Sequence, residues 1–353
     1  MTLAVTRVLG LFPSLGYLDG IGRSGLAAWS GVGSVPGVEP ILVCYGKTSP
    51  SFETGGKILH SRSHVGTLLN TMRAGASFQM TLVWHVHLLR LLPFLRGAGK
   101  VVVYLHGIEA WRPLPVSVRK QMSRVALVLS NSDYTWNRFL EHNPQFASLP
   151  HTTVPLGLDC PVQHQIAAPA VVPMALMIGR ITRTEAYKGH DAVVSVWPDV
   201  RRRIPGAELH VIGPGDLYDD LRALATRHGV ADSCHFHGPI RSQARKEELL
   251  VQSRCMALPS RGEGFGLAYI ESMRFGRPCL VSNSDAGREV VQPPEAGLAA
   301  DPQDRQGLVH ALCSLLSAGP EWDACASRAR ARYEAHYTEA AFVARLNAAL
   351  GLT

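Results

Sequence analysis

Residues 259–282 read "PSRGEGFGLAYIESMRFGRPCLVS", and this stretch decides the fold. It joins two apolar, strand-like runs through a glycine-rich turn and a helix that we expect to start near Leu267. Glu263 and Glu271 flank the Gly-Phe-Gly turn, so two carboxylates lie close to the end of the first run. Strand, turn and helix form the repeating unit of parallel α/β sheets, and ligands of such sheets bind beyond the carboxyl ends of the strands.

The same alternation extends along the whole chain. We expect strands at Ala4–Phe12, Pro40–Tyr45, Met80–Val86, Val101–Leu105, Ala126–Ser130, Met174–Gly179, Glu208–Gly213, His235–Gly238, Cys255–Pro259 and Pro278–Ser282. We expect helices at His190–Arg203, Leu217–His228, Gln243–Ser253 and Tyr269–Phe275. A proline-rich, irregular segment at 155–173 separates two rounds of this pattern, and 353 residues are enough for two cores. The sequence therefore predicts an α/β protein of two Rossmann-like, doubly wound domains, residues 1–158 and 159–337, with a ligand in the cleft that they face.

Composition favours a globular protein without a membrane span. Apolar residues make up 46% of the chain, and the longest apolar run, 170–178, is far shorter than the roughly 20 residues that cross a bilayer. The N-terminal residues show no pattern of a secretory signal. The seven cysteines are odd in number and scattered, which is typical of reduced thiols rather than of a disulfide framework or a zinc site. We therefore expect a cytoplasmic location.

Positive charge is concentrated in the first half. Residues 1–159 hold 14 of the 35 Lys and Arg but 7 of the 28 Asp and Glu, so residues 160–353 hold 21 of each. The segment "WHVHLLRLLPFLRGAGK" combines aliphatic residues with Arg90, Arg96 and Lys100, and a second group of cations is Arg119, Lys120 and Arg124. Cations that face one way attract an anionic leaflet. This pattern predicts peripheral attachment of the first domain to the inner face of the cell membrane, and solvated charge with a buried leucine-rich segment is the alternative. We expect no nucleic-acid partner.

The stretch "DGIGRSG" at 19–25 has the G-x-G-x-x-G spacing of a dinucleotide pocket. Two features disfavour a nicotinamide cofactor: seven residues separate Phe12 from Gly20, and the second expected strand ends in "LVCYGK", without a carboxylate for the ribose. A glycine-rich turn before a helix can instead bind another anion, such as a pyrophosphate, through its N–H groups. A permissive surface turn is the remaining interpretation.

Upstream of the glutamates, "LMIGRITRTEAYKGHD" places Arg180 after a strand and Lys188 before a helix. Together with Pro-Ser, Glu263, Gly-Phe-Gly and Glu271, these residues resemble glycosyltransferase family 4, the retaining glycosyl transferases of group 1 with the GT-B fold. Further stretches that resemble the family are "GIGR", "YLHGIEAW", "LSNSDYT", "HVIGPGD", "HFHGPI" and "DAGREVV". The resemblance also implies that a C-terminal helix at about 338–353 packs back on the first domain.

The resemblance implies a role for each motif at a nucleotide-sugar donor. Arg180, Lys188 and the Gly264, Phe265, Gly266 and Leu267 backbone would hold the diphosphate, with Gly20 and Gly22 approaching it from the first domain. Glu271 would accept the ribose hydroxyls, and the main chain from His237 to Ile240 would border the base. His106 and Glu263 would contact the transferred sugar, and they are the candidate catalytic residues. Glu109 would orient His106 or contact the acceptor, or it has only a surface role.

No cofactor or metal is expected. Asp-x-Asp, the usual metal clamp of the other large glycosyltransferase fold, does not occur in the sequence. The pairs His85/His87 and His235/His237 have a spacing that could indicate a metal. We expect alternation along a strand to point the two rings of each pair to opposite faces, so we interpret both pairs as structural. Retention implies no covalent nucleophile, because the leaving phosphate can deprotonate the incoming hydroxyl, so we name no catalytic base.

The sequence therefore predicts a retaining, metal-independent hexosyltransferase. The donor is expected to be a UDP- or GDP-sugar, and the acceptor a glycan or lipid-linked hydroxyl in cell-surface polysaccharide or glycolipid synthesis. Variable loops such as Lys47–Ser63 would contact the acceptor. Two alternatives are a catalytically silent sugar-nucleotide-binding subunit and a nucleotide-sugar 2-epimerase of GT-B architecture. The intact Arg180, Lys188, Glu263 and Glu271 series disfavours both.

Overall fold

The computed structural model describes residues 5–16, 20–46, 56–75, 77–159 and 168–352. The chain divides into two compact units. The first unit comprises Met1–Asp159 and Tyr337–Thr353, and the second comprises Cys160–His336. The C-terminal segment therefore belongs to the first unit.

The first unit holds a seven-stranded parallel sheet among its described residues, in the order β3-β2-β1-β4-β5-β6-β7. Its strands are β1 Thr6–Phe12, β2 Val38–Tyr45, β3 Lys57–Ser61, β4 Met80–Val83, β5 Lys100–Leu105, β6 Val125–Ser130 and β7 His151–Thr153. The order reverses between β1 and β4, and such a reversal opens a crevice at the carboxyl ends of the two strands.

The described part of the second unit repeats this topology in a six-stranded parallel sheet, in the order β10-β9-β8-β11-β12-β13. Its strands are β8 Met174–Ile178, β9 Glu208–Ile212, β10 Cys234–Gly238, β11 Cys255–Ala257, β12 Cys279–Val281 and β13 Gly297–Ala299. Here the order reverses between β8 and β11, so the residues that follow these two strands are brought together.

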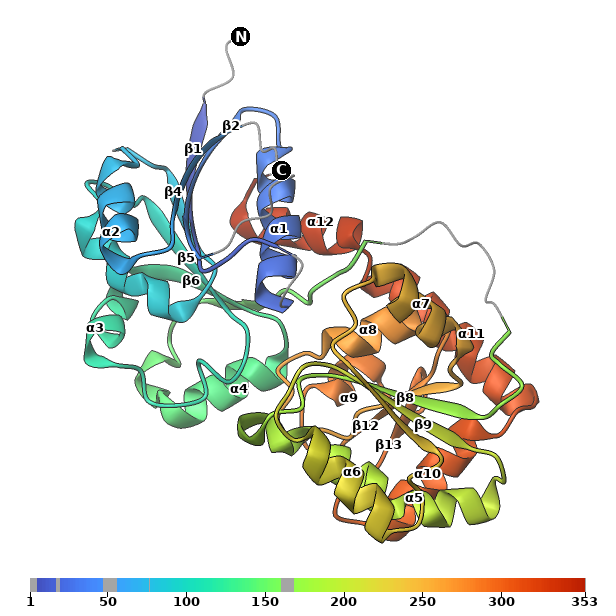
Figure 1. The fold of residues 1–353 in the computed structure, drawn as a ribbon. Helices are drawn as coiled ribbons and strands as arrows, with labels where there is room; N and C mark the ends of the chain where they lie inside the picture. The colour runs from blue at the N-terminus through green and yellow to red at the C-terminus, as the bar shows by residue number, and fades with distance from the viewer. Residues whose placement is uncertain (1–4, 17–19, 47–55, 76, 160–167, 353) are drawn as a thin grey trace. The chain divides into compact units, whose positions relative to one another are not determined.

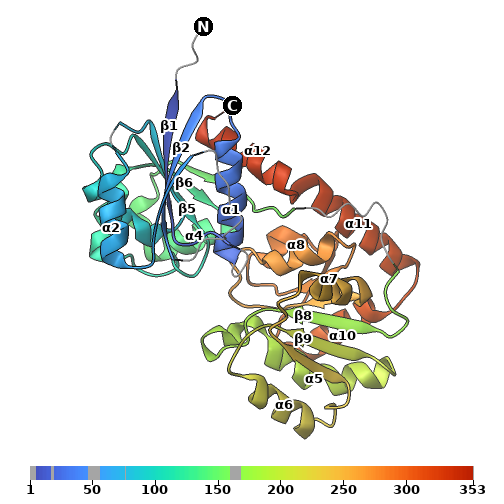
Figure 2. The same cartoon turned by 45° about the horizontal axis from the view of Figure 1, so that its top comes forward.

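Helices cover both faces of each sheet (Figures 1 and 2). The α-helices are α1 Gly20–Gly33, α2 His64–Arg73, α3 Val116–Arg119, α4 Asp133–His142, α5 His190–Arg203, α6 Tyr218–Arg227, α7 Gln243–Gln252, α8 Leu267–Met273, α9 Gly287–Val291, α10 Arg305–Leu316, α11 Pro320–His336 and α12 Glu339–Leu350. The 3-10 helices are η1 Val86–Phe94, η2 Met122–Arg124, η3 Pro144–Phe146 and η4 Arg183–Lys188. In the second unit α7 and α8 lie on one face of the sheet, and α5 and α6 lie on the other (Figures 1 and 2). Parallel strands covered in this way are buried, and most residues of β1, β5 and β8 are apolar for that reason.

The C-terminal helix α12 packs against α1. Its backbone enters beside Leu158, whose N–H donates to the Tyr337 carbonyl at 2.9 Å, and Asn347 Nδ2 donates to the Gly31 carbonyl at 3.2 Å. A Cβ on Gly31 would lie 2.5 Å from a methyl of Val343, so the two helices approach closely at this glycine.

The expected α/β fold with two parallel, doubly wound sheets is confirmed, and each expected strand is present within a few residues. Three short strands were not predicted, namely β3, β7 and β13, each of which lies at or next to an edge of its sheet. The strand expected to reach Val86 ends at Val83. The glycine-rich turn at 20–25 was placed wrongly, because α1 already begins at Gly20 and all three glycines belong to the helix.

Candidate active site

The crevice of the second sheet collects the charged residues that the sequence singled out. Arg180 follows β8, and Lys188 ends the 3-10 helix η4 that comes next. Glu263 lies in the loop after β11, and Glu271 lies within α8. Because β8 and β11 are neighbours, two segments about 80 positions apart in the sequence meet at one edge of the sheet.

Four of the side chains at this edge form an alternating chain of charges. Lys188 Nζ pairs with Glu263 Oε1, and Arg180 Nη2 pairs with Glu185 Oε1. Glu185 Oε2 lies 3.9 Å from Lys188 Nζ and so links the two pairs. The side chains of Lys188 and Glu263 are only 11% and 14% exposed, whereas that of Arg180 is 67% exposed. Two cations and two carboxylates therefore neutralise one another in a partly desolvated place.

Glu185 is a residue that sequence analysis missed. It lies in η4, three positions before Lys188, and its side chain is 11% exposed. The signal was present in "RTEAYK", where a carboxylate lies between two cations of a turn expected to bind phosphate. Glu185 restrains the Arg180 and Lys188 side chains, and it competes with any anion that these cations would bind.

The loop that carries Glu263 is held by Asp285. Its Oδ2 accepts from the Glu263 N–H and its Oδ1 accepts from the Gly287 N–H, both at 2.9 Å. Burial raises the pKa of this carboxyl to about 7, although both hydrogen bonds act against the rise. Gly266 precedes α8 with φ +85°, and a Cβ there would lie 2.3 Å from the Tyr269 ring. Glycine is therefore required in the turn, which places the Phe265 to Leu267 backbone at the start of α8.

Glu271 does not join the chain of charges around Lys188. Its Oε1 accepts from Lys246 Nζ at 2.9 Å, and the two side chains are 8% and 18% exposed. Lys246 comes from α7 and was not singled out in the sequence, because one cation in "SQARKEELL" resembles any solvated helix face. The carboxylate expected to bind the ribose is thus held by a cation in this structure.

His190 is a second residue that the sequence did not point to. It is the first residue of α5, directly after Gly189, whose φ of +78° and approach to the Pro259 carbonyl exclude a side chain. Its ring is buried, and Nε2 has no hydrogen-bond partner among the described residues. Burial, together with the charge of Lys188, lowers its pKa to about 4, so the ring is neutral near pH 7.

The histidines of β9 and β10 do not behave as expected. Alternate residues of a strand point to the same face, so the reason given for treating His235 and His237 as separate was wrong. Both rings lie beside His210, with centroids 4.6 and 5.0 Å away. His237 Nε2 is 3.0 Å from His210 Nδ1, and burial lowers the pKa of His237. Ile240 follows β10 at the carboxyl edge, so its placement near a base stays a prediction.

His85 and His87 are not strand residues. His85 caps η1, and the two rings are 5.3 Å apart. Burial lowers the pKa of His85 to about 4, helped by His87 and Arg90. Strand β4 was expected to continue to Val86. Because it ends at Val83, His85 and His87 lie at the start of η1 instead.

In the first unit, the strand ends around β1 and β4 are aromatic. Phe12 stacks on Trp84 with ring centroids 5.4 Å apart, and Trp84 contacts Tyr104 and His106 at 4.3 and 5.2 Å. Trp84 Nε1 donates to the Ile21 carbonyl at 3.2 Å, which ties the first turn of α1 to this aromatic cluster. Gly22 is buried and Gly20 is exposed, so Gly20 is the more accessible of the two proposed donor glycines.

His106 lies after β5, as expected, and is neutral. Its Nε2 is 2.7 Å from the Trp84 carbonyl, which requires the Nε2–H tautomer and leaves Nδ1 as the acceptor. Burial lowers its pKa to about 3, with His85 adding to the effect. Glu109 Oε1 accepts from the backbone N–H groups of His106 and Gly107 at 2.6 and 3.2 Å. Glu109 therefore fixes the His106 backbone rather than its ring.

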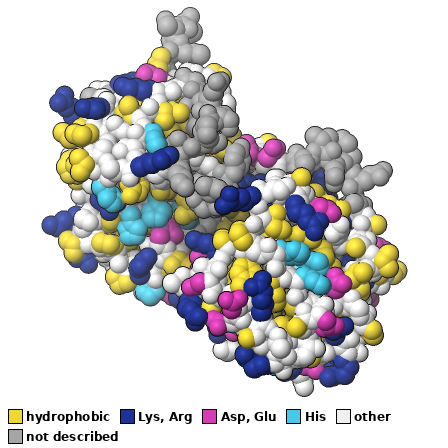
Figure 3. Space-filling view, viewed as in Figure 1, with side chains coloured by type: hydrophobic (Ala, Val, Ile, Leu, Met, Phe, Trp, Pro, Cys, Tyr) yellow, Lys and Arg dark blue, Asp and Glu magenta, His cyan; other side chains and the backbone are white. Residues whose placement is uncertain are grey.

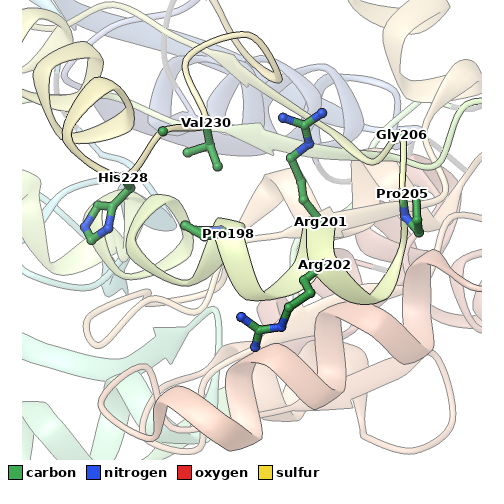
Figure 4. A pocket seen from close by; sticks show the side chains of 8 residues that line it. Pro198, Arg201, Arg202, Pro205, Gly206, His228 and Val230 are labelled. Atoms are coloured by element: carbon green, nitrogen blue, oxygen red, sulfur yellow. The ribbon is translucent and has the colours of Figure 1, made fainter.

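A separate pocket lies at the opposite edge of the second sheet (Figure 4). It is formed by the end of α5 and the turns that precede β9 and β10. The residues that line it are Pro198, Arg201, Arg202, Pro205, Gly206, His228, Gly229 and Val230. Arg201 Nη1 contacts both Asp232 oxygens at 2.8 and 2.9 Å, and Arg202 contacts Asp199 at 2.7 Å. These arginines are already paired, and the amino edge of a parallel sheet is not where ligands of this topology bind.

Comparison with known proteins agrees with the geometry of the second unit. Residues 172–318 match the family model described as glycosyl transferases group 1. The part of the chain that matches this family model is thus most of the second unit. The match contains Arg180, Lys188, Glu263 and Glu271, so the resemblance stated from the sequence is confirmed.

One relative of this chain is the GDP-mannose-dependent alpha-(1-6)-phosphatidylinositol monomannoside mannosyltransferase of Mycobacterium tuberculosis. It is 30% identical over 256 residues, which cover 65% of this chain and 66% of that protein. The glycogen synthase of the same species is 30% identical over 238 residues, 67% of this chain and 53% of that protein. The alignments thus leave about a third or more of each relative unmatched.

Solved structures extend the likeness to the whole fold. A glycosyltransferase from Rickettsia africae has a TM-score of 0.75 at 15% identity, over 98% of this chain and 99% of that chain. Anabaena HepE in complex with UDP and glucose also has a TM-score of 0.75 at 15% identity, over 99% and 100% of the chains. The expected GT-B fold is thereby confirmed. Among the helices of the described residues, none has the length and apolar character to cross a membrane.

Proposed function

We propose that this protein transfers a sugar, with retention of anomeric configuration and without a metal, from a nucleoside diphosphate sugar to a hydroxyl of a glycan or lipid-linked acceptor. The observation that carries the proposal is the chain of charges at the β8/β11 crevice, where Lys188 and Arg180 lie beside Glu263 and Glu185. The mannosyltransferase relatives, whose names include GDP-mannose and a phosphatidylinositol glycolipid, support a glycolipid acceptor.

The chain of charges is suited to a substrate that carries its own anions. In the protein alone, each cation is paired with a carboxylate. A diphosphate replaces these carboxylates as the partner of Lys188 and Arg180, and each new charged hydrogen bond contributes about 1.5–3 kcal/mol. The same cations then stabilise the charge that develops on the leaving phosphate, which is the task that a metal ion performs elsewhere.

The exchange gives Glu263 its second role. Once Lys188 has turned to the phosphate, the Glu263 carboxylate is free to accept hydroxyl groups of the transferred sugar. Its backbone N–H remains bound to Asp285, so the loop keeps its place while the side chain changes partner. A carboxylate near the anomeric carbon also favours the positive charge of the transition state. No residue is assigned as a base, since the leaving phosphate deprotonates the incoming hydroxyl.

Glu271 and His106 complete the proposed donor site. Glu271 would accept the ribose hydroxyls while Lys246 holds its side chain in place. The neutral His106 ring would accept a sugar hydroxyl at Nδ1. His106, Gly20 and Gly22 belong to the other unit, so their part in the site is inferred from the family resemblance.

The first unit offers a surface for the acceptor's membrane, though not the one predicted. The leucines of "WHVHLLRLLPFL" are core residues: Leu88, Leu89, Leu91 and Leu92 are buried. The exposed apolar residues are instead on α2, where Val65, Leu69 and Met72 are 69%, 43% and 54% exposed. Their spacing places them along one side of the helix. Hydrophobic side chains reach the surface over α2 with basic side chains beside them (Figure 3).

We call Val65, Leu69 and Met72 the α2 apolar stripe. Arg62 and Arg73 flank it at the two ends of the helix, and both are exposed. The 3-10 helix η1, which contacts α2, adds the exposed Arg90 and Phe94. An apolar strip with cations at its margin is the arrangement of helices that lie in the interface of an anionic bilayer. We therefore assign peripheral attachment, on the cytoplasmic side, to α2 and η1.

One experiment tests the proposed reaction. The purified protein is incubated, in the presence of a chelator, with a panel of UDP- and GDP-sugars, with and without a lipid extract, and release of nucleoside diphosphate is measured. Acceptor-dependent release with one donor supports transfer, and NMR of the product should show the donor's anomeric configuration. Release of nucleoside diphosphate that generates a free 2-epimer indicates the epimerase, and nucleotide binding without any turnover indicates the silent subunit. An inverted anomer rejects the retaining mechanism.

A further inference from the structure

A cluster of histidines and one glutamate lies on strands β9 and β10, outside the charged crevice. Glu208 and His210 occupy alternate positions of β9, so they share one face of the sheet. His235 of β10 pairs in register with His210 and lies directly across from it. The other face of the same strands is apolar, with Leu209 and Val211 fully buried. Histidine side chains gather on the face of the second unit that Figure 3 shows.

The geometry points to a binding site for a divalent transition-metal ion, formed by Glu208, His210 and His235. Each of these residues offers one ligand atom, and the three atoms lie within 4.8 Å of one another. Glu208 Oε2 is 3.1 Å from His210 Nε2 and 3.6 Å from His235 Nε2. A tetrahedral zinc ion with ligands at about 2.0–2.1 Å keeps its ligand atoms about 3.3 Å apart. The two measured separations lie on either side of this value.

Two further observations point to a ligand. His235 Nε2 is buried and has no hydrogen-bond partner among the described residues, although it faces a carboxylate oxygen. His237 is placed at a register shift of β10, and its Nε2 lies 3.0 Å from His210 Nδ1. A metal-bound histidine normally donates its other ring N–H to an acceptor, which fixes the tautomer and the orientation of the ring. His237 supplies such an acceptor to His210.

The type of metal follows from the donor atoms. Two imidazoles and a carboxylate suit zinc, and also nickel, cobalt or copper, better than magnesium or calcium, which prefer oxygen ligands alone. The side chains of Glu208 and His235 are 37% and 39% exposed, so an ion can enter from solvent and keep a water as its remaining ligand. Since β10 is the edge strand of its sheet, the ion would clamp this strand to β9.

The experiment is a zinc titration of the full chain, prepared without a histidine tag and stripped with a chelator. The wild type should bind one equivalent of zinc, and zinc should raise its Tm. His235→Ala and Glu208→Gln should each weaken zinc binding at least tenfold and remove the rise in Tm. His228→Ala, which removes an exposed histidine of the same unit outside the cluster, serves as the matched control and should titrate like the wild type.

X-ray absorption of the zinc complex identifies the ligands. The site predicts nitrogen and oxygen neighbours at about 2.0–2.2 Å. Sulfur neighbours would mean that zinc binds cysteines and would overturn the proposal. It is equally overturned if the wild type binds no zinc, or if both variants bind it as tightly as the wild type. Circular dichroism of each variant shows whether the fold is retained, and a double variant of His210 and His235 to Gln provides a second test with near-native volume.

Discussion

At the carboxyl edge of the first sheet the strand ends carry rings, whereas at the same edge of the second sheet they carry charges. At the first edge, Trp84 contacts both Phe12 and His106. The second has Lys188 and Glu263 in an ion pair with Arg180 and Glu185 beside them. Both sheets begin with the same order, in which the third, second and first strands are followed by the fourth, fifth and sixth.

The difference shows which part of the function the fold supplies. The topology supplies a place, because the reversal of strand order opens a crevice in each unit. The side chains determine what that place can bind. A neutral, aromatic edge suits sugar rings and hydroxyls, and an edge with alternating cations and carboxylates suits an anion that exchanges for the carboxylates. Substitutions at the charged edge should therefore change nucleotide affinity and the rate of transfer, whereas a substitution behind the aromatic edge should change the free energy of unfolding.

The largest effect is expected at the charged edge. Lys188→Ala should weaken binding of UDP or GDP by about 1.5–3 kcal/mol, roughly a 10- to 150-fold loss of affinity, because it removes a partly buried cation from the phosphates. The variant also leaves Glu263 and Glu185 without the charge between them, so the crevice becomes more negative. Calorimetry with both nucleotides measures the loss.

Arg227→Ala is the matched control for this measurement, since it removes one exposed cation of the same unit at the end of α6. If the wild type binds the nucleotide and Lys188→Ala binds it with the same affinity, then Lys188 is not part of the donor site. Glu271→Ala should cause a loss of similar size through the ribose, and Lys246→Ala a smaller one, because the carboxylate itself remains.

The next effect separates binding from turnover. Glu263→Gln should lower the rate of transfer at least tenfold, because the proposed contact to the sugar is weakened. The affinity for nucleoside diphosphate should stay the same or rise slightly, because Lys188 no longer has to break its ion pair with Glu263 in order to bind the phosphate. The measurements are initial rates with the donor found in the panel and calorimetry with the bare diphosphate. A variant with normal turnover would contradict the proposed sugar contact.

A third substitution tests the packing behind the aromatic edge. A Cβ on Gly25 would lie 3.0 Å from Trp84 Nε1 and 3.1 Å from the Phe12 ring, so Gly25→Ala should lower the free energy of unfolding by about 1–3 kcal/mol. Gly33→Ala in the same helix meets Pro40 at an ordinary 3.6 Å and should be neutral or slightly stabilising. Denaturant unfolding compares the two. Equal stability of both variants would show that the packing of α1 against Trp84 and Phe12 does not require glycine at position 25.

Gly25 also illustrates which parts of the fold and of the candidate site could be predicted from the sequence. Repeated apolar runs predicted both sheets, since buried parallel strands must be apolar. The positions of Arg180, Lys188, Glu263 and Glu271 could be predicted because a family motif contains them. Their partners could not: Glu185 and Lys246 look like solvated charges until the fold places Glu185 beside Arg180 and Lys188, and Lys246 beside Glu271. The glycines of "DGIGRSG" were expected in a loop, but glycine is compatible with a helix when a ring packs against it.

The smallest effect concerns the surface of the first unit. The α2 apolar stripe and its flanking cations should bind the protein to anionic vesicles, each cation contributing about 1 kcal/mol near the membrane, or roughly fivefold. Arg73→Gln should therefore reduce co-sedimentation with such vesicles about fivefold at low salt, and Leu69→Asp should reduce it further by placing a charge in the stripe.

Arg202→Gln is the control, because it removes an exposed cation of the second unit, and it should have no effect. Binding should rise with the anionic lipid fraction and fall with salt, because salt screens the exposed charges. If the protein stays in the supernatant on strongly anionic vesicles at low salt, or if Leu69→Asp binds like the wild type, then α2 does not contact a membrane and the acceptor is a soluble glycan.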